Sequence, residues 1–291
     1  MSAVGTLPLV SAEWAAARMA AGDVRLIHVS LDAKGYDEGH IAGAIFSDLH
    51  ADLAKAGTRA ETGATKRQYI VPTIGETGEA LSNWGALPRE HIVFYDDEGQ
   101  NRWAIRGYWL LRLYGFPLDL VHVLDGGLKA WVGGGGATTT DKSKPERTDG
   151  GALLAGLDAT LIATADEVLT WSREASATHG PTRILDVRLI DEYLGTDVRA
   201  ARGGRVPGAR HRLFSDFTNA AGGLRPAGEA LAVLRASGVE PSELRAVYCQ
   251  GGVRAALAWF ELHEIAGLTE VRNYAESWEE WGNRQDLPVE K

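Results

Sequence analysis

Residues 244–265 read LRAVYCQGGVRAALAWFELHEI, and this stretch decides the fold. The apolar run over 244–248 is typical of a buried strand, and apolar residues recur at helical spacing over 255–265. A strand that passes through a short loop into a helix is the building unit of α/β proteins with a mostly parallel sheet. Cys249 is therefore predicted at the carboxyl end of a strand, which is the edge where open α/β sheets bind ligands.

The loop that follows this strand has the composition of an anion-binding ring. Gly251 and Gly252 allow backbone angles that let the loop curl and turn its N–H groups inward. Arg254 adds a permanent positive charge at the start of the helix. The anion expected at the centre is the Cys249 thiolate, a candidate nucleophile. The alternative is an inert buried cysteine, as most lone cysteines are. The composition of the loop gives the catalytic interpretation equal weight.

The length of the loop separates two kinds of chemistry. The pattern here is C-x4-R, one residue shorter than the C-x5-R loop of cysteine phosphatases. The smaller ring leaves less room for a phosphate above the sulfur and favours a single extra sulfur atom on Cys249. Because Cys249 is the only cysteine, a dithiol relay, an intramolecular disulfide and a cysteine-based metal site are all excluded.

The two halves of the chain resemble each other. Segments 26–29, 39–44, 92–96 and 121–131 match segments 184–187, 204–209, 245–249 and 271–281 in the same order. A duplicated α/β domain is therefore predicted, each copy a mostly parallel sheet with helices on both faces. The stretch over 132–151 reads VGGGGATTTDKSKPERTDGG and is interpreted as a linker. The predicted domains are residues 1–132 and 158–291, joined by a linker over 133–157.

Helix starts in the two halves also correspond. Ser11 to Ala21 and Thr164 to Ser176 are amphipathic, and each begins at a Ser or Thr followed by an acidic residue, as at a helix N-cap. Residues 104–113 carry apolar side chains at helical spacing, as do residues 255–265.

Composition and charge exclude several classes of protein. Of 291 residues, 45% are hydrophobic and 24% are charged, and no apolar run is long enough for a transmembrane helix. The net charge of −9 makes nucleic acid an unexpected partner. The first ten residues lack the basic and apolar regions of a signal peptide, so with one cysteine a cytoplasmic location is expected. The eight histidines show no metal-ligand spacing, so no metal is expected.

Taken together, these motifs resemble the tandem-rhodanese sulfurtransferases, the thiosulfate and 3-mercaptopyruvate group, over nearly the whole chain. The resemblance rests on the six-residue loop at 249–254, on GHIAGA at 39–44 and GRVPGA at 204–209, and on the tails LDGGLKAW and YAESWEEW. It implies two rhodanese-like domains, the first of them an inactive copy. The position that matches Cys249 in that copy is Asp96, and a carboxylate cannot accept a sulfane sulfur.

The resemblance also implies a set of site residues. Cys249 is the expected catalytic residue, and Gln250, Gly251, Gly252, Val253 and Arg254 form the expected persulfide-binding loop. Arg188 is the first choice for an arginine that binds the donor. The further candidates are Arg199, Arg202 and Arg205 from the segment DVRAARGGR, and Ser277 and Trp278 as possible borders of the pocket. For each of these, a structural role or a solvated surface charge is the alternative.

The implied chemistry is a ping-pong transfer of sulfur through a persulfide on Cys249, with no cofactor. The expected partners are a small anionic sulfur donor and a thiophilic acceptor such as cyanide, with no membrane partner. Thiosulfate is favoured as the donor because Arg254 places a cation at the end of the loop. The alternatives are 3-mercaptopyruvate as the donor, a phosphatase or arsenate-reducing activity, and a non-catalytic rhodanese-like binding module.

Overall fold

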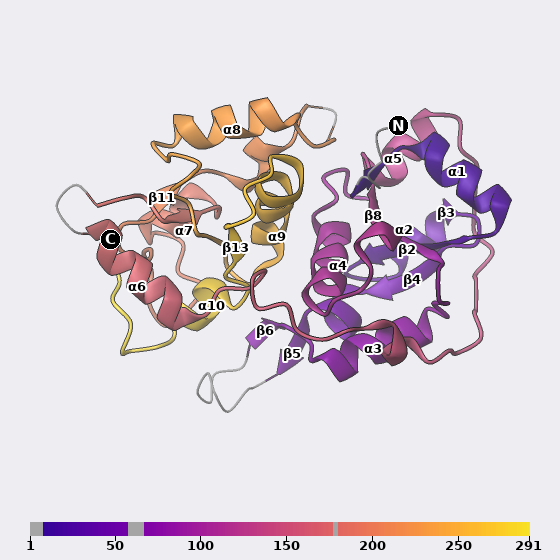
Figure 1. Cartoon of the computed structure of the whole chain (residues 1–291), viewed down its shortest axis with the longest axis horizontal. Helices are drawn as coiled ribbons and strands as arrows, with labels where there is room; N and C mark the ends of the chain where they lie inside the picture. The colour runs from indigo at the N-terminus through magenta and orange to yellow at the C-terminus, as the bar shows by residue number, and fades with distance from the viewer. Residues whose placement is uncertain (1–7, 58–66, 177–179, 221) are drawn as a thin grey trace. The chain divides into compact units, whose positions relative to one another are not determined.

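The computed structural model describes residues 8–57, 67–176, 180–220 and 222–291. The first seven residues, on which the signal-peptide expectation partly rests, lie outside this range. The chain divides into two compact units. Unit 1 comprises Met1–Lys55, Pro72–Asp158 and Ala220–Leu224, and unit 2 comprises Ala56–Val71, Ala159–Asn219 and Arg225–Lys291. Figure 1 shows helices packed around strands in both units.

Unit 1 contains a five-stranded sheet in the order β1-β8-β7-β2-β4, and every neighbouring pair is parallel. Its strands are β1 (Leu9–Val10), β2 (Val24–Ser30), β4 (Ile45–Asp48), β7 (His91–Tyr95) and β8 (Val121–Leu124). Its helices are α1 (Ala12–Ala21), α2 (Lys34–Glu38), α3 (Ile74–Asn83), α4 (Arg102–Leu113) and α5 (Gly127–Gly133), with η1 (Leu49–Leu53), η3 (Leu118–Leu120) and η4 (Gly150–Leu153).

Unit 2 repeats this plan with a four-stranded parallel sheet in the order β11-β10-β12-β13. Its strands are β10 (Ile184–Asp186), β11 (Arg210–His211), β12 (Ala246–Tyr248) and β13 (Arg272–Asn273). Its helices are α6 (Ala165–Ser176), α7 (Ile190–Leu194), α8 (Ala227–Ala236), α9 (Val253–Trp259) and α10 (Ser277–Trp281), with η5 (Phe214–Phe217) and η6 (Phe260–Ile265). The two remaining short ladders are β3 (His40–Ile41) with β9 (Thr138–Thr139), and β5 (Lys55–Gly57) with β6 (Arg67–Ile70).

Helices cover both faces of the sheet in unit 1, as predicted. Side chains alternate between the faces of a strand, so neighbours on β7 point to opposite sides. Val93 packs in one cluster with Ala15 of α1 and Trp131 of α5. Phe94 faces α4, where a Cβ added to Gly107 would lie 2.6 Å from its ring. The close approach of α4 to the sheet therefore requires glycine at this helix position.

The duplication extends to individual hydrogen bonds, which confirms the predicted repeat. In unit 1 the Tyr95 hydroxyl at the end of β7 accepts a hydrogen bond from the Ile41 N–H at 3.2 Å. In unit 2 the Tyr248 hydroxyl at the end of β12 accepts one from the Val206 N–H at the same distance. Each tyrosine thus ties the end of its strand to the segment of its own unit that reads GHIAGA or GRVPGA.

The predicted helix starts are also confirmed. The Ser11 hydroxyl accepts a hydrogen bond from Trp14 N–H at the start of α1. The Thr164 hydroxyl accepts one from Glu167 N–H ahead of α6, and the Glu167 carboxylate accepts one from Thr164 N–H in return. This reciprocal pair satisfies backbone donors that an uncapped helix would leave unpaired.

Most of the predicted linker packs on unit 1. Thr138 and Thr139 form β9 against β3, and the buried Gly150 donates its N–H to the Ser82 hydroxyl of α3 at 2.9 Å. A glycine-rich and polar stretch cannot build a core, but its backbone hydrogen bonds still attach it to one.

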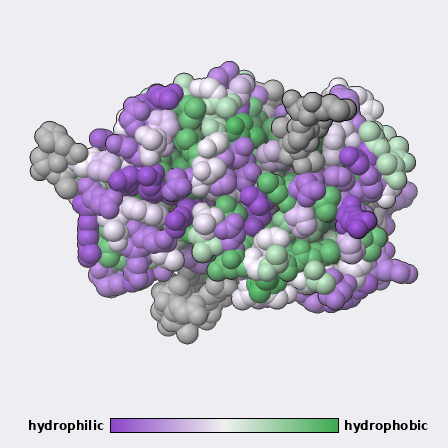
Figure 2. Space-filling model, viewed as in Figure 1, coloured by the Kyte–Doolittle hydropathy of each residue, from purple (hydrophilic) through white to green (hydrophobic). Residues whose placement is uncertain are grey.

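The surface matches the composition. Hydrophilic residues cover much of the face in Figure 2, with hydrophobic areas between them. Among the described residues, no helix combines the length and apolar character that a bilayer crossing requires.

Candidate active site

The Cys249 sulfur lies where the sequence placed it, directly after β12 and before α9. The side chain is 1% exposed. Its Sγ accepts a hydrogen bond from the Gly252 N–H at 3.1 Å. A backbone amide aimed at sulfur stabilises negative charge there, because an N–H donor bonds more strongly to an anion than to a neutral thiol.

Gly252 is needed for this geometry. Its φ of 80° lies in the left-handed region, which side chains disfavour. An added Cβ would also lie 2.8 Å from Ala275 Cα and closer still to the Ala275 carbonyl oxygen. Both the backbone angle and the neighbouring chain therefore select glycine at the residue that donates to Cys249.

The segment before and within α10 holds the other side of the loop. The Cys249 N–H donates to the Ser277 hydroxyl at 3.1 Å, and that hydroxyl donates to the Tyr274 carbonyl at 2.7 Å. The Trp278 N–H donates to the Cys249 carbonyl at 3.0 Å. Ser277 is fully buried and has a φ of 54°, an uncommon angle for a residue with a side chain. Ser277 thus fixes the backbone of Cys249.

Arg254 is paired rather than free. Its guanidinium makes a two-pronged ion pair with the Glu192 carboxylate, at 2.7 and 2.9 Å. Burial lowers the pKa of Arg254, but Glu192 and the charge of Cys249 outweigh it and hold the pKa above its ordinary value. Burial likewise raises the pKa of Glu192, and Arg254 more than compensates. The charge of Arg254 is therefore largely neutralised by a residue of α7.

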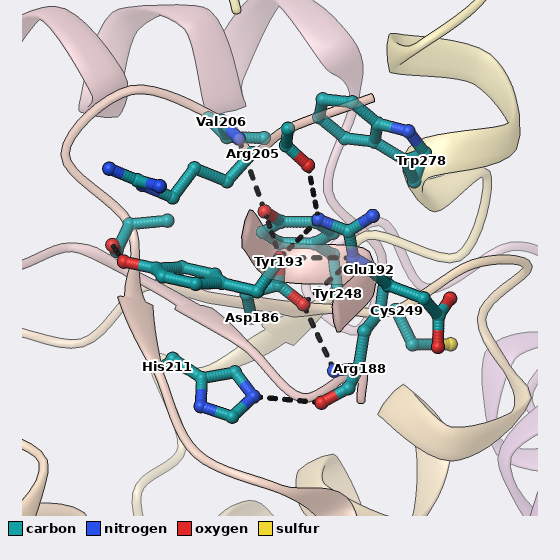
Figure 3. Close-up of polar contacts among 12 residues, drawn as sticks. Asp186, Arg188, Glu192, Tyr193, Arg205, Val206, His211, Tyr248, Cys249 and Trp278 are labelled. Carbon is teal, nitrogen blue, oxygen red and sulfur yellow. Dashed lines mark hydrogen bonds and ion pairs between the residues drawn. The ribbon is translucent and has the colours of Figure 1, made fainter. Parts of the chain in front are cut away.

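Arg188, the first choice for donor binding, is engaged inside unit 2. Its side chain is 1% exposed and makes an ion pair with Asp186 at 2.6 Å. It also donates to the Gly204 carbonyl at 2.7 Å. Its guanidinium lies 4.5 Å from the Trp278 ring centroid and 5.5 Å from that of Tyr248. Figure 3 shows this enclosed arrangement. For both Arg188 and Trp278 these contacts are those of a structural role, which was the alternative to binding the donor or bordering the pocket.

Arg202 and Arg205 are also committed to internal contacts. Arg202 donates to the carbonyl oxygens of Trp281, Gly282, Arg284 and Leu287, at and beyond the end of α10. Arg205 pairs with Glu290 and lies over the Tyr193 ring. Both arginines thus anchor the C-terminal segment instead of facing the loop.

Arg199 is the arginine of that cluster that remains beside the loop. Its carbonyl accepts a hydrogen bond from the Gln250 side-chain amide at 3.1 Å. Its guanidinium is about half exposed, lies 3.9 Å from Glu192 and pairs with the partly exposed Asp197 at 2.7 Å. Exposed pairs of this kind contribute only about 0–1 kcal/mol. Arg199 can therefore exchange Asp197 for an anionic ligand at little cost.

Unit 1 carries a carboxyl group at the position that matches Cys249. Asp96 is fully buried at the end of β7, and its Oδ2 accepts hydrogen bonds from the N–H groups of Trp103 (3.0 Å) and Ala104 (3.4 Å). Burial raises the pKa of Asp96 to about 7, against the lowering effect of these two donors. This strand end therefore offers backbone donors to an oxygen acid, not to a thiol.

Sequence reasoning missed the partners of the loop. Glu192, which is not among the predicted site residues, pairs with Arg254. The signal was available, since α7 follows β10 at the same carboxyl edge from which Cys249 emerges. Asn273, whose side-chain amide donates to the Gly252 carbonyl at 3.2 Å, gave no such signal.

Comparison with known proteins bears on the family. A rhodanese-like domain model matches residues 11–133 and again 164–284. A putative thiosulfate sulfurtransferase of Mycobacterium tuberculosis is 31% identical over 97% of each chain. The thiosulfate sulfurtransferase of Corynebacterium glutamicum is 32% identical, covering 97% of this chain and 90% of that protein.

Solved structures share the fold. The anaerobic ergothioneine biosynthesis enzyme of Chlorobium limicola, in complex with trimethyl histidine, is 25% identical. It has a TM-score of 0.79 over 98% of this chain and 70% of its own. SseA of Escherichia coli, described as a 3-mercaptopyruvate sulfotransferase, has a TM-score of 0.74 at 21% identity, over 94% of this chain and 99% of its own. The second likeness shows the fold alone.

The Arg188–Asp186 pair predicts a loss of stability on mutation. Arg188→Ala should leave the Asp186 carboxylate buried without its cation, which costs about 3–5 kcal/mol. We expect a clear drop in melting temperature, whereas Arg210→Ala, at an exposed position on β11, should shift it little. Unchanged melting together with a raised KM for the donor would instead make Arg188 a donor-binding residue.

Asp96 predicts a pH-dependent difference in stability. Because its folded-state pKa lies above its ordinary value, the folded state holds the proton more tightly than the unfolded state. The contribution of Asp96 to the free energy of unfolding is then fully present below about pH 4 and is lost as the pH rises through about 7. The melting temperature of Asp96→Asn relative to wild type should therefore rise over this interval and level off above it.

Melting curves at several pH values measure the difference in melting temperature between Asp96→Asn and the wild type. The exposed Asp119→Asn serves as a control. A difference that does not change with pH would contradict the buried, protonatable state of Asp96.

Proposed function

We propose, since this chain belongs to the rhodanese family of tandem-domain sulfurtransferases, that Cys249 carries a sulfane sulfur from a donor to an acceptor. The observation that supports this most directly is the Gly252 N–H aimed at Cys249 Sγ. A thiolate held in this way is a nucleophile, and the same donor remains in place while charge moves from one sulfur to the next.

The proposed reaction has two displacement steps. The Cys249 thiolate attacks the outer sulfur of thiosulfate, a new S–S bond forms, and the S–S bond of the donor breaks with its electron pair leaving on sulfite. An acceptor such as cyanide then attacks the terminal sulfur of the persulfide. The Cys249 S–S bond breaks, thiocyanate leaves, and the thiolate is regenerated. No external oxidant or reductant is needed, because each step only transfers a neutral sulfur atom between nucleophiles.

Thiosulfate is the donor that we propose, and Arg199 is the residue proposed to attract it. Arg254 contributes less positive charge than its position in the loop predicts, because Glu192 neutralises it. Arg199 is about half exposed and lies beside Gln250, and its close ion pair is with the partly exposed Asp197, while the buried Glu192 lies 3.9 Å away. A compact dianion can draw this side chain toward the loop and replace Asp197 as its partner.

A single unpaired thiol that must be available as a nucleophile is suited to a reducing compartment. A cytoplasmic location therefore remains part of the proposal.

Sulfur loading tests the proposal directly. Incubation with thiosulfate, removal of the excess donor and intact-protein mass measurement should show the gain of one sulfur atom per chain. The Cys249→Ser variant, which removes the only thiol, should gain none and should keep its fold by thermal melting. Wild-type protein that gains no sulfur from either thiosulfate or 3-mercaptopyruvate would reject the enzyme and favour the non-catalytic module.

Replacement of Arg199 tests the donor assignment. Arg199→Gln should raise the KM for thiosulfate about ten-fold, the loss expected for one charge-assisted hydrogen bond. Arg202→Gln, which disturbs only the C-terminal anchor, is expected to lower the melting temperature instead. Initial rates with both donors, at fixed cyanide and ionic strength, give the comparison. A higher wild-type kcat/KM with 3-mercaptopyruvate would reverse the donor while leaving the Cys249 persulfide in place.

A further inference from the structure

The strand β6, from the first half of the sequence, folds as part of unit 2. The N–H groups of Gln68 and Tyr69 donate to the two carboxylate oxygens of Glu279, at 2.9 and 3.1 Å. Glu279 is 8% exposed and belongs to α10, near which β6 lies in Figure 1. The N–H of Glu279 also donates to the Gln250 carbonyl at 2.8 Å. Glu279 thus connects β6 to the loop that carries Cys249.

Tyr69 packs directly against that loop. A Cβ added to Gly251 would lie 2.5 Å from both Cβ and Cγ of Tyr69, far closer than real side chains approach. Gly251 does not have the left-handed backbone angle of Gly252. The two neighbouring glycines are therefore required for different reasons. Gly252 is required by its φ and by Ala275, whereas Gly251 is required by the half-buried side chain of Tyr69.

Gly251 and Gly252 share one peptide group, and its N–H is the donor to Cys249 Sγ. The carbonyl of Gly252, on the next peptide, is held by the Asn273 side chain at 3.2 Å. A peptide group is rigid and planar, so a contact that fixes the Cα of Gly251 also limits where that N–H points. Tyr69 lies on the side of Gly251 that a side chain would otherwise occupy.

We propose that Tyr69 is a positioning residue for the sulfur-transfer reaction. Its side chain packs on Gly251 and thereby keeps the Gly252 N–H directed at Cys249 Sγ, with Glu279 holding β6 in place. This inference rests on the proposed function of Cys249 as the sulfur carrier. It adds a residue that lies far from the loop in sequence.

Two substitutions of Tyr69 separate packing from other roles. Tyr69→Phe keeps the three atoms that contact Gly251 and should load sulfur at close to the wild-type rate. Tyr69→Gly removes all of them and should load about ten-fold more slowly at neutral pH, as expected when one hydrogen bond to an anionic sulfur is weakened. Loading is followed by intact mass after timed exposure to thiosulfate. If Tyr69→Gly melts early, Tyr69→Ala replaces it; this variant keeps Cβ but removes Cγ and Cδ2, so the slowing expected is smaller but in the same direction.

A pH profile distinguishes a role of Tyr69 in directing the Gly252 N–H at Cys249 from a general effect on protein stability. Because Cys249 is the only thiol, its alkylation by iodoacetamide can be followed cleanly by mass. With a less well directed N–H, the thiolate forms at higher pH, so the alkylation profile of Tyr69→Gly should move to higher pH. The profile of Tyr69→Phe should coincide with that of the wild type.

A double-variant comparison tests the contact itself. Gly251→Ala should impair loading because its methyl group collides with Tyr69. Combining it with Tyr69→Gly should restore loading to at least the rate of Tyr69→Gly alone, since the methyl group then fills the vacated space. Gly252→Ala is the matched control, and Tyr69→Gly should not rescue it, because its collision is with Ala275.

Wild-type loading and an unshifted alkylation profile in a folded Tyr69→Gly protein would overturn the inference, and so would failure of the double variant to recover. If the wild type itself gains no sulfur, the proposed function fails. The alkylation profiles then still decide whether Tyr69 positions the Gly252 N–H that donates to Cys249 Sγ.

Discussion

The hydrogen bond from the Gly252 N–H to Cys249 Sγ is the constraint on which the rest of unit 2 depends. For this bond to form, a strand must end at residue 248, a left-handed glycine must follow, and the chain must enter α9 at once. Each of these conditions has its own support. Tyr248 ties the strand end to Val206, Asn273 holds the Gly252 carbonyl, and Ser277 holds the Cys249 N–H. A small sulfur atom is thus fixed by contacts from several parts of one unit.

The two units show how one framework can hold different chemistry at the same place. Both end a central strand in a tyrosine whose hydroxyl is tied to an earlier segment, at Ile41 and at Val206, and both present backbone N–H donors to an acidic side chain just beyond the strand. In unit 1 that side chain is Asp96, whose burial raises its pKa to about 7. In unit 2 it is a thiol beside the Arg254–Glu192 pair. The fold supplies the acceptor position, and the residue there decides whether that position holds an oxygen acid or a thiol.

Local patterns predicted the architecture well and the side-chain partners poorly. The strand before Cys249, the helix caps at Ser11 and Thr164, and the internal repeat were predicted because each depends on residues close together in sequence. The arginines were harder, because an arginine beside a strand end can turn outward to a ligand or inward to an acid. Arg188 turns inward to Asp186, two residues away. The contact of Tyr69 with Gly251 joins distant parts of the chain and left no local pattern.

The membership of β6 in unit 2 has a consequence for how the protein is made. During synthesis, β6 leaves the ribosome with the first half of the chain, long before β12, the Cys249 loop or α10 exists. Unit 1 can close its five-stranded sheet before unit 2 is made, because the strands of that sheet all precede residue 125. Residues 67–70 must wait, and their backbone donors find Glu279 only after α10 has been made. The Cys249 loop is therefore completed only after α10 has been made, and cutting the chain at the glycine-rich stretch between the halves would separate Cys249 from a strand that its own unit uses.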